Sequence, residues 1–208
     1  GLVLIAPDTS PRNTGIEGAT KDWDFGEGAG FCIDATQSPW SKHFRMESWI
    51  VHELLPTVID RFNVDLTRVG ITGHSMGGHG ALTLAMKHRS TFKSVSALAP
   101  IAAPTHCPWG EKAFDEYLGP DRQAWRAHDA CELLSASHCP FPNGILVDQG
   151  LGDKFMVEQL KPELLEGACG VANQPLTLRR HAGYDHGYYF VASFIADHLR
   201  FHAAQLNA

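Results

Sequence analysis

The sequence lacks the long apolar runs, basic clusters and close-spaced cysteine pairs that mark several large classes of protein. No apolar run approaches the ~18 residues that span a bilayer, and residues 2–6 are too short and wrongly flanked for a signal peptide. The net charge is −6 without any Lys/Arg cluster, so the footprint of nucleic-acid binding is missing. We therefore expect a globular protein whose partner is neither nucleic acid nor a membrane.

Cysteines are few: five, an odd number, scattered at positions 32, 107, 131, 139 and 169. No Asn-x-Ser/Thr glycosylation acceptor is present either. Both features favour a reducing, cytoplasmic location. Cys131 and Cys139, with His138 between them, lack the close-spaced ligand pairs of a zinc site, so we expect no metal.

The 208 residues, 44% of them hydrophobic, suit one α/β domain with a substantial core. Strand patterns are expected at residues 2–6, 69–72, 95–99, 144–147 and 176–179. Helical patterns alternate with them at residues 46–62, 76–88, 156–168 and 188–206, and Pro56 should kink the first. This alternation predicts a mainly parallel sheet with helices on both faces.

The most informative motif is Gly73-His74-Ser75-Met76-Gly77-Gly78, which lies between a strand pattern and a helix pattern. A G-x-S-x-G sequence in this context is typical of the sharp turn that exposes a nucleophilic serine. We expect Gly73 and Gly77 both to be required, because larger neighbours would clash in such a turn. The helix start favours developing negative charge. Ser75 is the predicted nucleophile.

A serine nucleophile needs a histidine base held by a carboxylate, and this fold type places them later in the chain, carboxylate first. After the strand at 144–147, Asp153 lies in the loop beyond two glycines, whereas Asp148 is at the strand edge and is interpreted as structural. His181 and His186 both precede the last helix. We favour His186, at the far end of its loop, and expect His181 and His74 to pack.

Five motifs, in order along nearly the whole chain, resemble the S-formylglutathione hydrolase family, also called esterase D. They are Pro7-Asp8-Thr9-Ser10-Pro11-Arg12, Trp23-Asp24-Phe25-Gly26 with Gly28-Ala29-Gly30-Phe31, the serine motif, Cys107-Pro108-Trp109-Gly110 and Gly183-Tyr184-Asp185-His186. The resemblance implies an α/β-hydrolase fold and a cofactor-free thioesterase that releases formate and glutathione in formaldehyde detoxification and also hydrolyses simple carboxylic esters. It places the family's triad on Ser75, Asp153 and His186, and it suggests a homodimer.

The family carries an additional N-terminal stretch, including a loop after its third strand that supplies one oxyanion donor. The resemblance therefore implies one α/β-hydrolase domain over residues 1–208 that is N-terminally incomplete and begins at about the fourth strand of the family fold. The N–H of Met76 is then the remaining oxyanion donor. We expect the strand at 2–6 to lie roughly 9 to 10 Å from 69–72, twice the usual ~4.8 Å, unless the two pair directly.

Substrate contacts are expected from the two aromatic motifs. Trp23, Phe25 and Trp109 should form the rim of a small, partly dry acyl pocket, although Trp23 and Trp109 could equally pack loops onto the sheet. Candidate partners for the carboxylates of glutathione are Arg12, Lys21, Lys42 and Lys112. The alternative functions are a broad carboxylesterase, an acyltransferase of the same fold or an inactive fragment.

Overall fold

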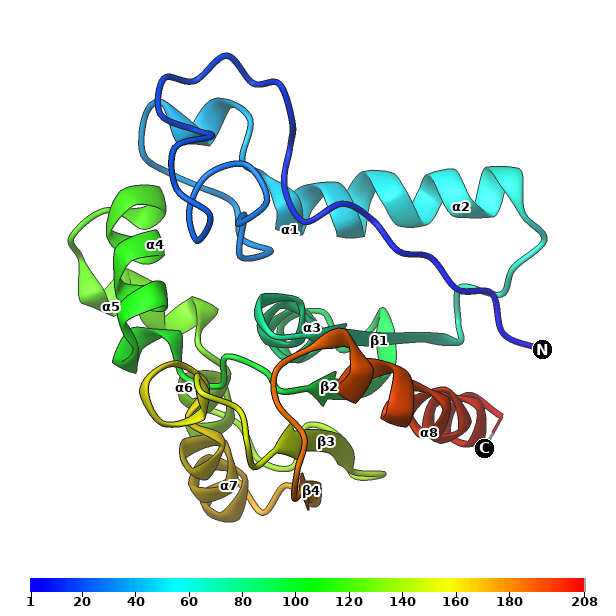
Figure 1. Ribbon diagram of the computed structural model, residues 1–208. Coiled ribbons are helices and arrows are strands. Elements are labelled where there is room, and N and C mark those ends of the chain that lie inside the picture. Colours follow the sequence, from blue (N-terminus) through cyan, green and yellow to red (C-terminus); the bar gives the residue numbers. More distant parts are fainter. Residues whose placement is uncertain (208) are drawn as a thin grey trace.

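The computed structural model describes residues 1–207, which contain a four-stranded, all-parallel sheet with helices on both faces (Figure 1). The strands are β1 (Val69–His74), β2 (Phe92–Leu98), β3 (Ile145–Gly150) and β4 (Leu176–His181), hydrogen-bonded in that order. Each connection between neighbouring parallel strands crosses over through helices, as parallel pairing requires. The expected α/β class is confirmed.

The alternation of side chains along β2 shows which helix covers which face. Val95 and Ala97 belong to the core cluster that includes α3 (Met76–Lys87). Ser94 and Ser96 point the other way, where their hydroxyls meet the two ring nitrogens of His202 in α8 (Tyr188–Leu206) at 2.6 and 2.8 Å. The sheet is therefore enclosed between α3 and α8.

Shorter helices occupy the connections, and none of the helices within residues 1–207 is long and apolar enough to cross a bilayer. Ahead of the sheet lie η1 (Trp40–Lys42), α1 (Met46–Ser48), η2 (Trp49–Leu54) and α2 (Leu55–Arg61). Between β2 and β3 lie η3 (Pro104–His106), α4 (Pro108–Leu118), α5 (Arg122–Trp125), η4 (Arg126–His128) and α6 (Ala130–Ser135). Before β4 lie η5 (Met156–Leu160) and α7 (Pro162–Val171).

A second, aromatic core fixes the glycine-rich loop between residues 8 and 42 against α4. Phe25 is buried between Trp40 and Tyr117, with ring centroids 4.8 and 4.7 Å away. The Tyr117 hydroxyl accepts a hydrogen bond from the Gly26 N–H and donates one to the Ala29 carbonyl, each at 3.0 Å. The loop is thus a packed part of the fold and lies beside α4 and α5 (Figure 1).

The expected strand at residues 2–6 is wrong. This segment has no regular secondary structure, and its apolar side chains are exposed, Leu4 by 68%. Within residues 1–207, β1 pairs with β2 alone, so no partner strand offers residues 2–6 a ladder of hydrogen bonds. An apolar pattern without such a partner does not make a strand.

The helix expected at residues 46–62 is present, but it contains a π-helical segment where a kink was expected. The π-helical η2 separates α1 from α2, and Pro56 follows it as the second residue of α2. A proline in regular α-helix removes one hydrogen bond and clashes with the preceding turn. The wider π-helical turn accommodates such a disturbance without ending the helix.

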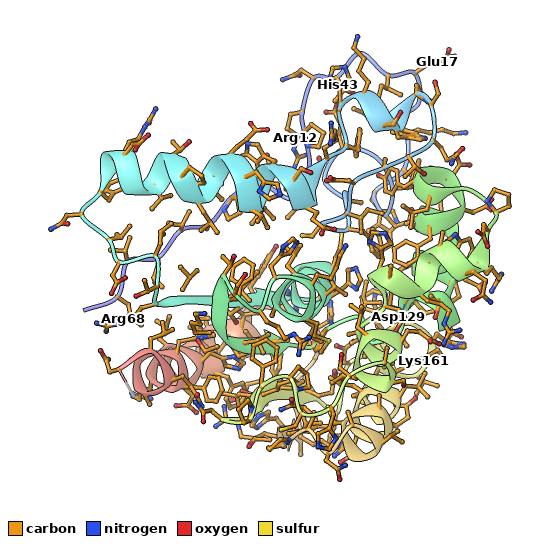
Figure 2. All side chains as sticks on the ribbon, turned by 180° about the vertical axis from the view of Figure 1, so that it is seen from behind. Arg12, Glu17, His43, Arg68, Asp129 and Lys161 are labelled. Atoms are coloured by element: carbon orange, nitrogen blue, oxygen red, sulfur yellow. The ribbon has the colours of Figure 1, made fainter. Side chains whose placement is uncertain are left out.

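The end of α8 is hydrogen-bonded to the residue that precedes β1, at the edge of the sheet opposite the one that carries Ser75. Arg68, which precedes β1, donates from Nε to the Leu206 carbonyl at 2.7 Å and from its guanidinium to the Asn207 side chain. Figure 2 shows Arg68 where the end of α8 meets the start of β1. This contact anchors α8 at one end, while its other end follows the loop that carries His186.

Candidate active site

Ser75 occupies a strained turn between β1 and α3. Its backbone, at φ 57° and ψ −119°, lies where residues other than glycine are rarely found. Three backbone hydrogen bonds hold it there: its N–H donates to Leu98, and its carbonyl accepts from Ile101 and His79, at 2.9 to 3.2 Å. The turn places Ser75 at the carboxyl edge of the sheet and at the start of a helix.

The structure confirms one of the two expected glycine requirements of the motif and contradicts the other. A Cβ on Gly73 would lie 2.1 Å from the Gly77 carbonyl oxygen, so glycine is required there. Gly77 itself has nothing within 4 Å of such a Cβ, and the expectation of a clash at Gly77 is wrong. The second crowded position is Gly78, 2.9 Å from Cβ of Pro100. Close packing of α3 against the segment after β2 therefore explains the second glycine.

The structure brings Ser75, His186 and Asp153 into one hydrogen-bonded row. His186 Nε2 lies 2.8 Å from Ser75 Oγ, and His186 Nδ1 lies 2.5 Å from Asp153 Oδ2. Asp153 is buried, and burial by itself raises a carboxyl pKa. The hydrogen bonds from His186 and from the Phe155 N–H outweigh burial and hold the pKa of Asp153 below its ordinary value. Asp153 is therefore ionised when it faces the imidazole.

Two glycines explain how the Asp153 loop reaches His186. A Cβ on Gly150 would lie 2.5 Å from the Tyr184 carbonyl oxygen, and one on Gly152 would lie 3.1 Å from the same atom. The Gly152 N–H donates to that oxygen at 2.8 Å. The loop after β3 thus lies directly against the loop that carries His186, a contact that side chains would prevent.

Asp148 and His181, the other pair considered, meet each other away from Ser75. Asp148 lies within β3, fully buried, and accepts two hydrogen bonds from Arg179 at 2.6 and 2.5 Å. His198 and His181 contact the same carboxylate at 3.1 and 3.2 Å, and the ring of His181 stacks on Phe194 at 3.7 Å. This network links β3, β4 and α8, so its role is to stabilise the packing of these elements.

His74 packs directly on the imidazole of His186. The two ring centroids are 4.5 Å apart, and the Phe155 ring is nearly perpendicular to that of His186, with centroids 5.2 Å apart. Burial, and then repulsion from His186, lower the pKa of His74 to about 4. His74 is consequently neutral near pH 7 and contributes a packing surface without a second positive charge.

A row of aromatic rings leads from His186 to the surface. Phe155 contacts Trp109 with ring centroids 4.7 Å apart, and Trp109 meets Trp23 edge to face at 5.3 Å. Trp23 is 74% exposed at the outer end of the row. Phe25 does not join it, because that ring lies in the aromatic core beside α4. Sequence reasoning missed Phe155, although its place two residues after Asp153 was a usable signal.

The start of α3 can receive negative charge beside Ser75. Met76 is the first residue of α3, and the N–H groups of the first turn have no acceptor within their own helix. Its N–H is thus available near the serine oxygen. Within residues 1–207, no three side chains of His, Cys, Asp or Glu gather as metal ligands.

A serine on a strand–turn–helix elbow, with carboxylate and histidine following in that order on one parallel sheet, is the arrangement of the α/β-hydrolases. Comparison with known proteins specifies the family. A family model described as "Putative esterase" matches residues 1–201. The chain is 50% identical to an S-formylglutathione hydrolase of Rattus norvegicus over 209 residues, covering 100% of this chain and 74% of the relative.

Further relatives agree. An S-formylglutathione hydrolase of Paracoccus denitrificans is 49% identical, with 100% of this chain and 73% of the relative covered. The solved S-formylglutathione hydrolase of Agrobacterium tumefaciens superposes with a TM-score of 0.92 at 48% identity, over 96% of this chain and 72% of that one. The chain belongs to the S-formylglutathione hydrolase family. A ferulic acid esterase at 18% identity and TM-score 0.66, over 84% of this chain and 64% of that one, shares the fold.

Proposed function

We propose that this protein is a serine thioesterase that hydrolyses S-formylglutathione to formate and glutathione and also acts on simple carboxylic esters. The observation that carries the proposal is the imidazole of His186, bonded on one side to Ser75 and on the other to Asp153. The relatives at 50% and 49% identity are both named S-formylglutathione hydrolase, and this name indicates the thioester.

In the first half of the reaction, Ser75 Oγ attacks the thioester carbonyl carbon while its proton passes to His186 Nε2, 2.8 Å away. Asp153 stabilises the imidazolium that forms, because its carboxylate is ionised and bonded to Nδ1. The carbonyl oxygen becomes an oxyanion, and the N–H of Met76 is the proposed donor to it.

The tetrahedral intermediate then collapses. The carbon–sulfur bond breaks, and His186 returns the proton to the leaving sulfur, which releases glutathione as a thiol. Water next attacks the formyl ester of Ser75, again with His186 as base, and formate leaves with Ser75 regenerated. One water is consumed, and no electrons are exchanged with a cofactor.

The proposed acyl pocket lies beside the aromatic row. Trp109 is the proposed apolar wall, with Trp23 at its outer rim. We place the protein in the cytoplasm as a single-domain enzyme and homodimer. The five cysteines, all free, and a substrate built on glutathione are suited to a reducing compartment.

The test is a comparison of kcat/KM for S-formylglutathione with kcat/KM for 4-nitrophenyl acetate and longer 4-nitrophenyl esters. The proposal expects the thioester to be the best substrate by at least about tenfold. A preference for simple esters would instead identify a broad carboxylesterase. Transfer of the acyl group to an added alcohol in preference to water would identify an acyltransferase.

A further inference from the structure

We propose that Lys154 binds a carboxylate of the leaving group, and so gives the site its preference for an anionic thiol such as glutathione. This inference rests on the proposed function. Lys154 was not among the cations that the sequence suggested for this role. In the sequence it lies between Asp153, the proposed catalytic carboxylate, and Phe155, whose ring contacts His186, the proposed base.

The backbone around Lys154 is fixed by Asp153 itself. While Oδ2 of Asp153 contacts His186, its Oδ1 accepts the Phe155 N–H at 2.8 Å, and its carbonyl accepts the Met156 N–H at 3.2 Å. Lys154 is the first central residue of this turn. Its position relative to the catalytic row is therefore determined by the same carboxylate that holds the base.

The side chain of Lys154 extends from this turn over the ring of Phe155. Its Nζ lies 4.9 Å from the centroid of the Phe155 ring, and that centroid lies 5.2 Å from the centroid of the His186 ring. Lys154 is exposed, and within residues 1–207 it forms no ion pair. Its ammonium is free to meet an anionic ligand near the catalytic histidine.

Two of the four cations suggested by the sequence, Lys112 and Arg12, are already paired. Lys112 is held between Asp22 and Asp24 at 2.9 and 2.7 Å, and Arg12 is paired with Asp8 at 2.7 Å. Two carboxylates surround the single charge of Lys112, so an incoming anion would meet net negative charge there. Lys154 has no such competitor.

The chemistry of the reaction indicates which half of the substrate faces Lys154. His186 must protonate the leaving sulfur, so the sulfur and the peptide attached to it lie on the His186 side of the reacting carbon. The glycyl carboxylate of glutathione is about 7 Å from the sulfur in an extended peptide. The Phe155 ring separates Lys154 from His186, with Lys154 Nζ 4.9 Å from its centroid and the His186 centroid 5.2 Å from it, so the ammonium lies within reach of the leaving peptide.

The experiment measures inhibition of 4-nitrophenyl acetate hydrolysis by S-methylglutathione, which presents the carboxylates but has no acyl group. Lys154→Ala should raise the inhibition constant about threefold and Lys154→Glu about tenfold at low salt, and Lys154→Arg should change it less than about twofold. Added NaCl should weaken inhibition of the wild type but not of Lys154→Ala. The KM for S-formylglutathione should follow the same order.

Two controls separate local from general effects. Lys93→Glu makes the same charge change at the N-terminal end of β2, the edge of the sheet opposite Ser75, and should leave the inhibition constant unchanged. S-formyl-N-acetylcysteamine, a thioester without carboxylates, should be hydrolysed equally by wild type and Lys154→Glu. Unchanged inhibition in Lys154→Glu, an equal effect of Lys93→Glu, or no inhibition of the wild type would overturn the inference.

The proposed function has a separate readout. If the wild type fails to hydrolyse S-formylglutathione but S-methylglutathione still inhibits it through Lys154, the thioesterase proposal fails and the binding role of Lys154 stands. If the wild type hydrolyses S-formylglutathione and Lys154→Glu changes neither KM nor inhibition, the function stands and the role of Lys154 is rejected.

Discussion

Replacing His186 by alanine should nearly abolish turnover, whereas the same change at His181 should be mild. His186 makes both contacts of the proposed catalytic row, to Ser75 Oγ at 2.8 Å and to Asp153 at 2.5 Å. Without it the serine has no base and the leaving sulfur has no acid. Because such residues act as a unit, we expect a loss in kcat on the order of a thousandfold or more.

His181 provides a matched comparison, since it is the last residue of β4 and His186 lies in the loop that follows it. His181→Ala removes one hydrogen bond to Asp148 at 3.2 Å and the stacking on Phe194, whose ring centroid is 3.7 Å away and nearer than those of Tyr184 and Phe190. At about 1 kcal/mol each, the two losses total roughly 2 kcal/mol of stability. Arg179 still pairs with Asp148, so kcat should stay within about threefold of wild type.

The assay combines steady-state hydrolysis of 4-nitrophenyl acetate, which needs no glutathione contact, with thermal unfolding of each variant. His186→Ala should unfold near the wild-type temperature while losing turnover, and His181→Ala should unfold at a lower temperature while keeping it. A folded His181→Ala variant with the larger loss in kcat would refute the assignment of the base.

Three further changes test other parts of the account. Gly73→Ala should lower both activity and unfolding temperature, because its Cβ would lie 2.1 Å from backbone; wild-type values in both assays would contradict this. Asp148→Asn should destabilise the fold by about 3 kcal/mol in urea unfolding, since Arg179 loses a buried ionic partner. Burial raises the Asp148 pKa, but bonds from His198 and Arg179 lower it well below the ordinary range. This stabilisation is present above about pH 4 and is lost as the pH falls below it. The free energy of unfolding of Asp148→Asn should therefore fall less steeply below pH 4 than that of the wild type, and an unchanged slope would contradict the argument. Trp109→Ala should raise activity on longer acyl esters relative to formyl, and equal losses at every acyl length would indicate a packing role.

The sequence was most informative where local pattern and local chemistry agree. The strand–elbow–helix context identified the position of Ser75, and the two glycines ahead of Asp153 separated it from Asp148. Both glycines prove to lie against the Tyr184 carbonyl, a contact that no local pattern shows. The parallel sheet with helices on both faces followed from the alternation of strands and helices alone.

Features that depend on a distant partner were not predictable in this way. Residues 2–6 have a strand pattern but no strand beside them within residues 1–207. Phe25 belongs to the same aromatic motif as Trp23, yet Trp40 and Tyr117, remote in the sequence, bury it in a core. A pattern of apolar residues predicts the type of element, but it does not identify the strand or side chain against which that element packs.

The central claim is that Ser75, activated by His186, is the nucleophile of a thioesterase. The most direct measurement is S-formylglutathione hydrolysis and fluorophosphonate labelling of the wild type and of Ser75→Ala, which removes a single oxygen. The account predicts labelling of the wild type at Ser75, and no labelling and no turnover in a variant that folds normally. Retention of more than a few per cent of the activity by Ser75→Ala, or labelling at another residue, would contradict it.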